Sequence, residues 1–576
     1  MRAMDLPFAQ RLQSLQLREN QIFLALTILV GIIAGLAAVL FTLSIKVATQ
    51  LFFGISPSHL RIVLVPTVVS LFTGFLLVKF FPEVRGSGVP QTEASYHLQH
   101  GYIPARVPFG KFLTGVLCIG SGHSMGREGP SVQIGAGLAS MLGRWFHLSP
   151  ARVQRLIPVA SAAALSAAFN TPVAAVLFAL EEIIGDMNAA LIGSAVVASV
   201  TSVIVERSIL GNDPVFHVPP YHLVHPAELL AYAGLGIVGG IVSLAFCKGL
   251  LWLRAWFLRL PARSKIFQPA MGGLIIGVML LFFPQILGVG YEYVDQALNG
   301  GLLLRTMFIL CLAKLVGTII SYASGNAGGI FAPSLYLGAM AGGTVGVLVH
   351  RFAPFPTSDP GAYALVGMGT LFAGIIRAPM TSVFMILEVS GNYSIIVPVI
   401  LSNAIAYFIS RTLQPTPIFD LLSRQDGLDL PSLEEEREVP LLRVEDAMRP
   451  PLGQTLTGNM TLAEAQHHVQ GSAQEFFLVA MGGDDWSGIS RGHLMDMIAN
   501  SDVPLSRILG ARIPYLHPDH PLDTALRLIG EWPLLPVVHR ANVQQLLGVV
   551  SLDDVMRAYR GAGLHETHAE TAQVVP

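Results

Sequence analysis

The chain has 576 residues, of which 52% are hydrophobic and 12% are charged, and its mean hydropathy is +0.59. This is the composition of a polytopic membrane protein, and the length is enough for more than one domain. The net charge of −2 gives no reason to expect a nucleic-acid partner. The 17 histidines are scattered without metal-ligand spacing, so we expect no metal site.

The N-terminus carries Arg2, Arg11 and Arg18 ahead of an apolar run that begins at Ile22. It lacks the short core and the small-residue cleavage site of a signal peptide, so we expect residues 1–20 to form a retained cytoplasmic helix. Further charge-free runs follow, and several are long enough to span a bilayer. Others are broken by Gly and Pro, which a membrane tolerates only where the backbone is buried in protein or lines a polar cavity. The pattern favours a transporter or a channel.

Three sequence blocks occur twice in this membrane region. The pattern F-P-x-[VI]-x-G-x-G stands at 81–88 and at 283–290, an offset of 283 − 81 = 202. Residues 130–136 match residues 333–339 at an offset of 333 − 130 = 203. The third pair has an offset of 207 and consists of Pro172, Val176, Leu180 and Glu181, matched by Pro379, Val383, Leu387 and Glu388. This order predicts two homologous halves, at about 21–208 and 226–422, and such paired, interrupted segments are typical of inverted repeats around a midplane substrate site.

One carboxylate, Glu128, lies at a predicted helix start inside the apolar region. Pro130 suits the first turn of a helix, and the mostly apolar run Val132–Leu142 continues it. The unpaired N–H groups of a first turn and the positive end of the helix dipole bind negative charge. We therefore expect Glu128 to compete with a dissolved anion for one site and to yield that site when it is protonated.

Beyond residue 422 the composition changes from apolar to charged. We expect a solvated linker at 423–443, followed by a soluble α/β region in two repeats, at 444–500 and 501–562. We expect the last residues, 563–576, to be disordered.

The two tail repeats share a pattern, since the segment from Val444 resembles the segment from Leu505, at an offset of 505 − 444 = 61. Pro536–Val538 and Leu547–Val550 have the composition of strands that flank a turn. A helix is predicted at Leu552–Tyr559.

The membrane region also contains three glycine-rich loops: Gly86-Ser87-Gly88-Val89-Pro90, Gly126-Arg127-Glu128-Gly129-Pro130 and Gly328-Gly329-Ile330-Phe331-Ala332-Pro333. In this order and spacing they resemble the signature loops of the CLC chloride channel and transporter family, over about residues 18–422. The tail resembles a tandem pair of CBS domains. The resemblance implies an all-α polytopic membrane domain at 21–422, built from two inverted repeats, and a soluble α/β CBS pair after it.

The resemblance also implies a multi-pass protein of the plasma (inner) membrane, in contact with lipid and with both termini cytoplasmic. It implies a homodimer with one anion pathway per subunit. The protein would be a transporter and not an enzyme, it would need no cofactor, and its substrates would be chloride and protons.

The family pattern assigns roles to individual residues of this chain. Ser87 would offer its hydroxyl to a central chloride, and Ile330 and Phe331 would offer backbone N–H groups. Glu128 would be the outer gate, and Glu182 would be the inner proton-transfer group of an exchanger. The remaining residues of the loops around the anion would be Gly86, Gly88, Val89, Pro90, Arg127, Gly129 and Gly329.

One position departs from the family pattern. The family places a tyrosine hydroxyl on the central anion near the end of the membrane domain, where this sequence has Phe419. The ring can still wall off the site, but a hydrogen bond worth about 1.5–3 kcal/mol with a charged partner is missing.

Glu128 and Glu182 together favour chloride/proton antiport. The alternative is a voltage- or pH-gated passive chloride channel of the same family. Channels of the family usually carry an apolar residue at the position of Glu182. CBS tails also occur on magnesium transporters, but a cation path needs clustered carboxylates in the membrane, and here the acidic residues are isolated. A nucleotide-dependent enzyme is disfavoured because Gly120, Gly122 and Gly126 do not have G-x-G-x-x-G spacing.

The tail resembles CBS domains in one further detail. Ser551 and Asp554 form the Ser-x-x-Asp arrangement with which such domains hold a nucleotide ribose, whereas the first repeat has Ser490 followed by His493 in place of the aspartate. At most one adenine nucleotide is therefore expected per subunit. A purely structural tail that stabilises the dimer is the alternative.

Overall fold

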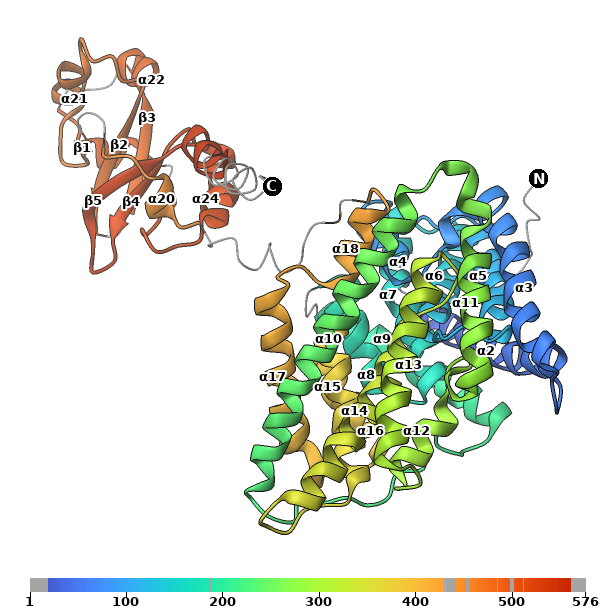
Figure 1. Ribbon diagram of the computed structural model, residues 1–576. Coiled ribbons are helices and arrows are strands. Elements are labelled where there is room, and N and C mark those ends of the chain that lie inside the picture. The colour runs from blue at the N-terminus through green and yellow to red at the C-terminus, as the bar shows by residue number, and fades with distance from the viewer. Residues whose placement is uncertain are drawn as a thin grey trace. The chain divides into compact units, whose positions relative to one another are not determined.

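The computed structural model describes residues 19–185, 189–428, 430, 442–451, 455–483, 485–497, 502–510 and 512–560. Almost all of the expected N-terminal helix at 1–20, much of the linker and the tail at 563–576 lie outside these residues. The chain divides into two compact units, Met1–Leu433 and Glu434–Pro576. The described part of the first unit is helical, and the second unit contains both strands and helices (Figure 1).

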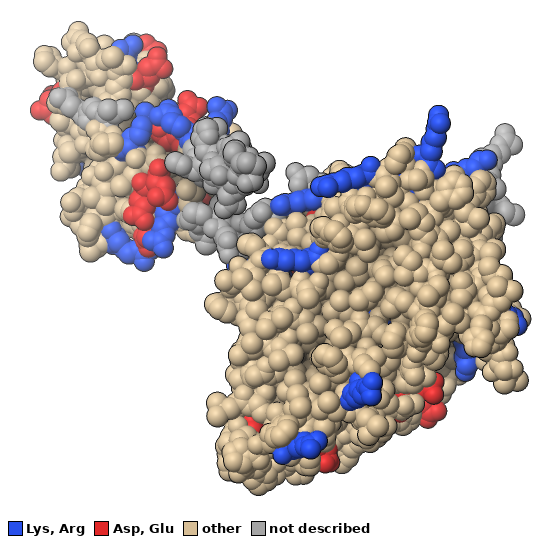
Figure 2. All heavy atoms as spheres, viewed as in Figure 1, with Lys and Arg blue, Asp and Glu red and all other residues tan. Residues whose placement is uncertain are grey.

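The helices of the first unit are α2 (Glu19–Phe53), α3 (His59–Lys79), α4 (Val89–His97), α5 (Arg106–Gly120), α6 (Glu128–Trp145), α7 (Pro150–Phe169), α8 (Pro172–Phe178), α9 (Ala189–Leu210), α10 (Glu228–Arg259), α11 (Gln268–Phe282), α12 (Tyr291–Leu298), α13 (Leu304–Ala323), α14 (Phe331–Phe352), α15 (Pro360–Ile376), α16 (Pro379–Ser390), α17 (Ile396–Leu413) and α18 (Ile418–Gln425). Seven stretches of the described chain are long and apolar enough to cross a membrane. On the face seen in Figure 2, Lys and Arg lie toward two opposite edges of this unit and a broad band between them is almost uncharged. The protein is an integral, multi-pass membrane protein.

The duplicated sequence blocks are helix starts. α4 and α12 begin at Val89 and Tyr291, an offset of 291 − 89 = 202. The starts of α6 and α14 have an offset of 331 − 128 = 203, and those of α8 and α16 have an offset of 379 − 172 = 207. α7 and α15 both end on a residue with positive φ, Asn170 at 58° and Arg377 at 68°. The predicted duplication is therefore confirmed at the level of individual helix ends.

The two halves have opposite orientations. The acidic residue after α8, Glu181, accepts hydrogen bonds from the first turn of α16, and the acidic residue in the last turn of α16, Glu388, accepts hydrogen bonds from the first turn of α8. Each helix therefore ends where the other begins, so the two run antiparallel, as an inverted repeat requires.

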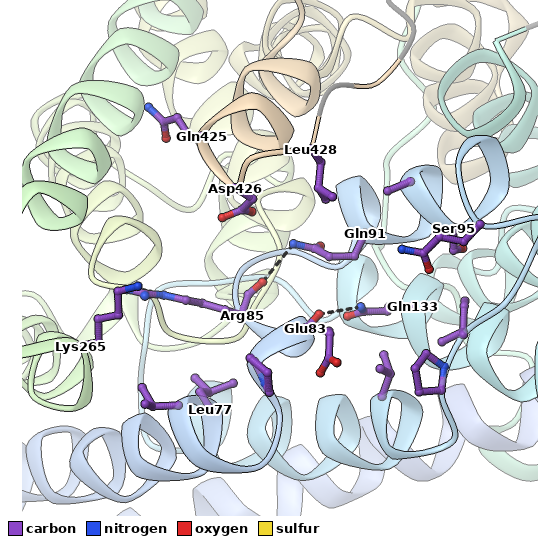
Figure 3. A pocket seen from close by; sticks show the side chains of 18 of the residues that line it. Leu77, Glu83, Arg85, Gln91, Ser95, Gln133, Lys265, Gln425, Asp426 and Leu428 are labelled. Atoms are coloured by element: carbon purple, nitrogen blue, oxygen red, sulfur yellow. Dashed lines mark hydrogen bonds between the residues drawn. The ribbon is translucent and has the colours of Figure 1, made fainter. Parts of the chain in front are cut away.

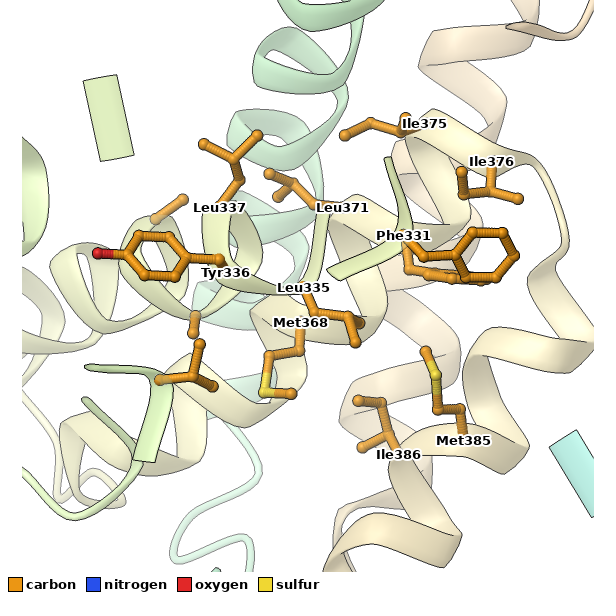
Figure 4. Close-up of a cluster of buried hydrophobic side chains, with 14 of the residues drawn as sticks. Phe331, Leu335, Tyr336, Leu337, Met368, Leu371, Ile375, Ile376, Met385 and Ile386 are labelled. Atoms are coloured by element: carbon orange, nitrogen blue, oxygen red, sulfur yellow. The ribbon is translucent and has the colours of Figure 1, made fainter. Parts of the chain in front are cut away.

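α14 and α15 pack closely against each other in the buried core (Figure 4). Their backbones approach so closely that a Cβ added at Gly338 would collide with the carbonyl of Gly367. Small residues permit this approach in membrane proteins, where packing contacts stabilise the helix pairs. Phe331 begins α14 in the same core and is only 1% exposed. The start of α14 is thus held on a rigid support.

The tail contains two small sheets. In the first, β1 (Leu456–Thr457) is parallel to β2 (Phe476–Gly482), and β3 (Asp485–Ser490) is antiparallel to β2. In the second, β4 (Leu535–His539) is antiparallel to β5 (Asn542–Val550). Both predicted strands of the second repeat are confirmed and are longer than predicted, and residues 552–560 are helical.

The short helix at the start of each tail repeat packs on the other repeat. The tail helices are α20 (Val444–Ala447), α21 (Leu462–Val469), α22 (Arg491–Asp496), α23 (Leu505–Ile508) and α24 (Leu522–Leu528). Val444 of α20 is buried with Leu522 and Val549 of the second repeat, whereas Leu505 of α23 is buried with Leu456 of the first. This exchange of segments ties the two repeats into one α/β unit.

Candidate anion and proton sites

The three glycine-rich loops meet in the first unit. The backbone of Gly126 donates to the carbonyl of Gly329 at 2.8 Å, and Gly329 donates back to Gly126 at 2.7 Å. Gly328 donates to the carbonyl of Gly86 at 3.1 Å. Segments from both halves are thus joined by backbone hydrogen bonds, and the residues predicted to surround an anion are brought together.

Ser87 presents an unpartnered hydroxyl at this junction. Its side chain is fully buried, and its Oγ has no hydrogen-bond partner. The flanking glycines Gly86 and Gly88 have φ of 82° and 103°, which a residue with a side chain adopts only with strain. A Cβ added at Gly129 would lie 2.5 Å from Ser87 Oγ, so the hydroxyl lies directly beside the second loop. A buried donor without an acceptor is a candidate anion ligand.

The first turn of α14 faces the same junction. Ile330 precedes the helix and Phe331 begins it, and both are buried. The first N–H groups of a helix have no acceptor within the helix, and they carry the positive end of its dipole. The ring of Phe331 packs against Phe178 at 4.8 Å and Phe372 at 5.1 Å between ring centroids. These contacts fix the direction in which the N–H groups point.

Glu128 begins α6 and is completely buried. Its Oε1 accepts a hydrogen bond of 2.6 Å from the hydroxyl of Tyr291 and lies 3.9 Å from Nε of Arg127. Its Oε2 has no hydrogen-bond partner, although the backbone N–H groups of Glu128 and Ala332 act on the carboxylate electrostatically. The carboxylate therefore lies at the N-termini of α6 and α14 together, where an anion would bind.

Glu182 lies in a π-helical turn, η2 (Ala179–Ile184), which directly follows α8. Only 9% of its surface is exposed. Such turns are frequent at functional sites. Glu93 of α4 is 2% exposed, has an Oε2 without a hydrogen-bond partner, and interacts electrostatically with Glu182 and Asp420. Glu93 is not among the residues that the sequence motifs indicated, although an acid one turn after Pro90 is a visible signal.

Phe419 belongs to α18 and is fully buried. Its ring stacks on that of Phe331 with 6.4 Å between the centroids and 27° between the planes. The ring thus reaches the start of α14, as the family pattern implies, without a hydroxyl to offer an anion.

Two buried lysines, Lys111 and Lys314, support the duplicated loops. Nζ of Lys111 donates to the carbonyls of Val84 at 2.9 Å and Gly86 at 2.6 Å. Nζ of Lys314 donates to the carbonyl of Gly288 at 2.7 Å and to two neighbouring carbonyls. The two lysines are not part of the motifs described above, although their spacing of 314 − 111 = 203 matches the repeat.

A cavity of about 660 Å³ lies beside Arg85, which directly precedes the glycine-rich loop that begins at Gly86 (Figure 3). Arg85 and Lys265 bring positive charge to it, and Glu83 and Asp426 bring negative charge. Its wall also contains four glutamine side chains, those of Gln91, Gln99, Gln133 and Gln425. The rest of the lining is mostly apolar, so these charged and amide groups are the ones that can hold water or ions in this space.

The family model described as "voltage gated chloride channel" matches residues 69–411, more than half of the chain. The chain belongs to this family. A CBS-domain model matches residues 505–561, the second repeat of the tail. In the described part of this CLC protein no group of three or more His, Cys, Asp or Glu residues could hold a metal ion.

Two relatives are named H(+)/Cl(−) exchange transporter ClcA. The protein from Vibrio cholerae is 30% identical over 417 residues, which is 69% of this chain and 88% of the relative. The protein from Vibrio campbellii is 29% identical over 409 residues, which is 68% of this chain and 87% of the relative.

Solved CLC structures have the same fold. The structure of a slow cyanobacterial Cl−/H+ antiporter has a TM-score of 0.65 and 28% identity, and it covers 72% of this chain and 99% of the antiporter. The structure of a eukaryotic CLC transporter has a TM-score of 0.59 and 20% identity, and it covers 92% of this chain and 97% of the transporter. The second likeness concerns the fold alone.

The CBS tail of this CLC protein contains one Ser-x-x-Asp arrangement that is internally bonded. Ser551 Oγ donates to Asp554 at 2.6 Å, and Nε of Arg449 forms an ion pair with Asp554 at 2.7 Å. Burial alone would raise the pKa of Asp554, but the bonds from Ser551 and the charge of Arg449 keep it below its ordinary value. In the first repeat Ser490 accepts a hydrogen bond from the backbone of His493, and no carboxylate stands at that position.

Proposed function

We propose that this CLC protein exchanges chloride for protons across the membrane. The observation that carries the proposal is the buried carboxylate of Glu128, which lies where α6 and α14 begin, one residue before Gly129, the residue that stands against the unpartnered hydroxyl of Ser87. Two helix N-termini attract an anion, so ionised Glu128 and chloride compete for one position. Protonation removes the charge of Glu128 and frees the position for chloride.

In this proposal Ser87 and the N–H groups of Ile330 and Phe331 hold the central chloride. These ligands are dipoles, and a halide held by dipoles without a full opposite charge is released easily. Phe419 closes the site on one side by contact alone. Weak holding favours turnover, because the anion must leave as readily as it binds.

Glu182 supplies the second protonatable group that coupled exchange requires. Ionisable residues buried in a membrane domain commonly belong to ion or proton pathways. The carboxyl group of Glu93 lies within electrostatic range of Glu182 and belongs to the same cluster of buried acids. Protons would thus pass between Glu182 and Glu128 while chloride follows its own path.

The two Vibrio relatives named as exchange transporters, and the likeness to a cyanobacterial antiporter, support exchange over passive conduction. The cavity that Arg85 and Lys265 line would be the aqueous approach to Ser87, which stands two residues after Arg85 in the chain. We propose that this approach opens to the cytoplasm, that both termini are cytoplasmic, and that the protein acts as a homodimer in the inner (plasma) membrane.

The test uses purified protein in liposomes that contain chloride. An outward chloride gradient should drive proton uptake, and the reversal potential should move with the pH gradient as well as with the chloride gradient. Chloride flux without pH change, with a reversal potential set by chloride alone, would contradict exchange and support the passive channel. Cross-linking in native membranes would test the dimer.

A further inference from the structure

We infer that the hydroxyl of Tyr291 latches the carboxylate of Glu128 in its closed position, which makes Tyr291 a positioning residue for transport. The inference rests on the proposed role of Glu128 as the gate. Tyr291 Oη donates to Glu128 Oε1 at 2.6 Å, although the two residues lie far apart in the sequence. An O–H donor at this distance from a carboxylate makes a charge-assisted bond, which is stronger than a neutral one.

Tyr291 reaches the gate because of the second copy of the F-P-x-[VI]-x-G-x-G block. Gly290 ends that block with a φ of 81°, and Tyr291 then begins α12. The first copy ends at Gly88 and places the Ser87 hydroxyl at the loop junction. The first copy of the block thus contains a hydroxyl of the anion site, and the second copy ends directly before the residue that bonds the gate.

The ring of Tyr291 is held from several sides. Phe216 packs against it edge-on with 4.9 Å between the centroids, and Phe169 lies at 6.4 Å. The guanidinium group of Arg127 lies 5.7 Å from the ring centroid. Such contacts restrict rotation of the ring, so the hydroxyl keeps its direction when Glu128 moves away. Tyr291 also lines a cavity of about 340 Å³, which leaves room on the other side of the ring.

The charged groups that face the gate act differently from Tyr291. Arg127 approaches Oε1 only to 3.9 Å, and Lys314 of α13 acts on Glu128 electrostatically while its own protons are bonded to backbone carbonyls. Glu206 of α9 interacts electrostatically with Arg127. These charges stabilise ionised Glu128 without fixing its position, whereas a hydrogen bond depends on direction. Tyr291 therefore determines how firmly the carboxylate is held.

Loss of the hydroxyl should favour opening. The ionised, closed carboxylate would lose a charge-assisted donor, so protonation and departure would occur at lower proton concentration. In Tyr291→Phe the midpoint of the pH dependence of chloride efflux should therefore rise by about one to two pH units. Efflux at neutral pH should increase.

The experiment measures chloride efflux from liposomes with full-length protein over a series of pH values. Tyr293→Phe is the matched control, because Tyr293 lies two positions further on α12 and packs on the same core cluster. Its pH profile should equal that of the wild type. Replacement of Tyr291 by 3-fluorotyrosine keeps the ring and makes the hydroxyl a stronger hydrogen-bond donor, so the midpoint should move to lower pH. This second variant tests the latch even if Tyr291→Phe does not fold.

The Glu128→Gln background separates the two hypotheses. If Glu128→Gln is insensitive to pH and Tyr291→Phe adds nothing to it, while Tyr291→Phe alone shifts the midpoint, the latch is supported. If Glu128→Gln is insensitive to pH but Tyr291→Phe and the fluorinated variant keep the wild-type midpoint, the latch is wrong and the gate stands. If Glu128→Gln keeps a wild-type pH profile, the proposed gate itself is wrong, and the latch falls with it.

Discussion

Glu181, which follows α8, caps the first turn of α16, and Glu388, in the last turn of α16, caps the first turn of α8. Glu181 accepts backbone hydrogen bonds from Met380 at 3.0 Å and Thr381 at 2.8 Å, and Glu388 accepts them from Val173 at 2.9 Å and Ala174 at 2.8 Å. A carboxylate at a helix N-terminus satisfies free N–H groups and interacts favourably with the dipole. The pair is a structural joint between the two halves.

Loss of either cap should therefore reduce stability without uncoupling transport. We expect Glu388→Ala to lower the stability of the membrane domain by about 1–2 kcal/mol. Thermal unfolding of the protein in detergent measures this, with Glu292→Ala, an exposed acid on α12, as the control. An unchanged melting temperature together with lost proton coupling would mean that Glu388 has a role in transport.

Glu128→Gln should make chloride efflux insensitive to pH. The amide has nearly the same shape but carries no charge that could compete with chloride at the two helix N-termini. Efflux from liposomes over a pH series checks the prediction, with Glu292→Gln as the control that retains the wild-type profile. A wild-type pH profile in Glu128→Gln would move the gate to another group.

Glu182→Gln should abolish proton movement and leave chloride flux. The amide cannot carry a proton at this position, whereas the chloride ligands around Ser87 are unchanged. Simultaneous recording of proton uptake and chloride efflux measures both fluxes. Glu181→Gln is the control, because the neighbouring acid caps α16 and is expected to keep coupling. Continued proton uptake in Glu182→Gln would exclude this residue as the inner station.

Phe419→Tyr should tighten chloride binding by about tenfold, because a hydroxyl at the ring edge would give the central anion a hydrogen bond worth about 1.5 kcal/mol or more. Calorimetric titration of the purified protein with chloride measures the dissociation constant. Phe419→Leu, which has neither ring nor hydroxyl, is the control and should not bind more tightly than the wild type. If the tyrosine variant binds chloride as the wild type does, the ring edge does not face the anion.

In the CBS tail we expect at most one weakly bound adenine nucleotide per chain, at Ser551 and Asp554. The pKa of Asp554 is lowered, and the side chain is ionised at any pH above it. Its interactions therefore persist at neutral pH and are lost only as the pH falls through the lowered pKa. A ribose must compete with Arg449 for this carboxylate. Calorimetry on the full chain with ATP, ADP and AMP tests binding, with Asp554→Ala expected to abolish it and the exposed Asp553→Ala to leave it. No heat in the wild type would make the tail a structural element.

The sequence alone determined the class of protein and the position of its key loops. The evidence was the composition, the three duplicated blocks and the order of the glycine-rich loops. These are local features, and they can be read from the residue types alone. The helix start at Glu128 follows from such a feature, because Pro130 in the first turn has a fixed φ that suits a helix, and the apolar run after it continues the helix.

Only the tertiary structure decided which of these groups have partners. The bond from Tyr291 to Glu128, the buried Lys111 and Lys314, and the ion pair of Arg449 with Asp554 join residues that lie far apart in the sequence. Such contacts arise from helix packing and from the need of each buried polar group for a partner, and a local pattern does not specify where that partner stands. For the same reason the unpartnered hydroxyl of Ser87 could be recognised only in the folded chain.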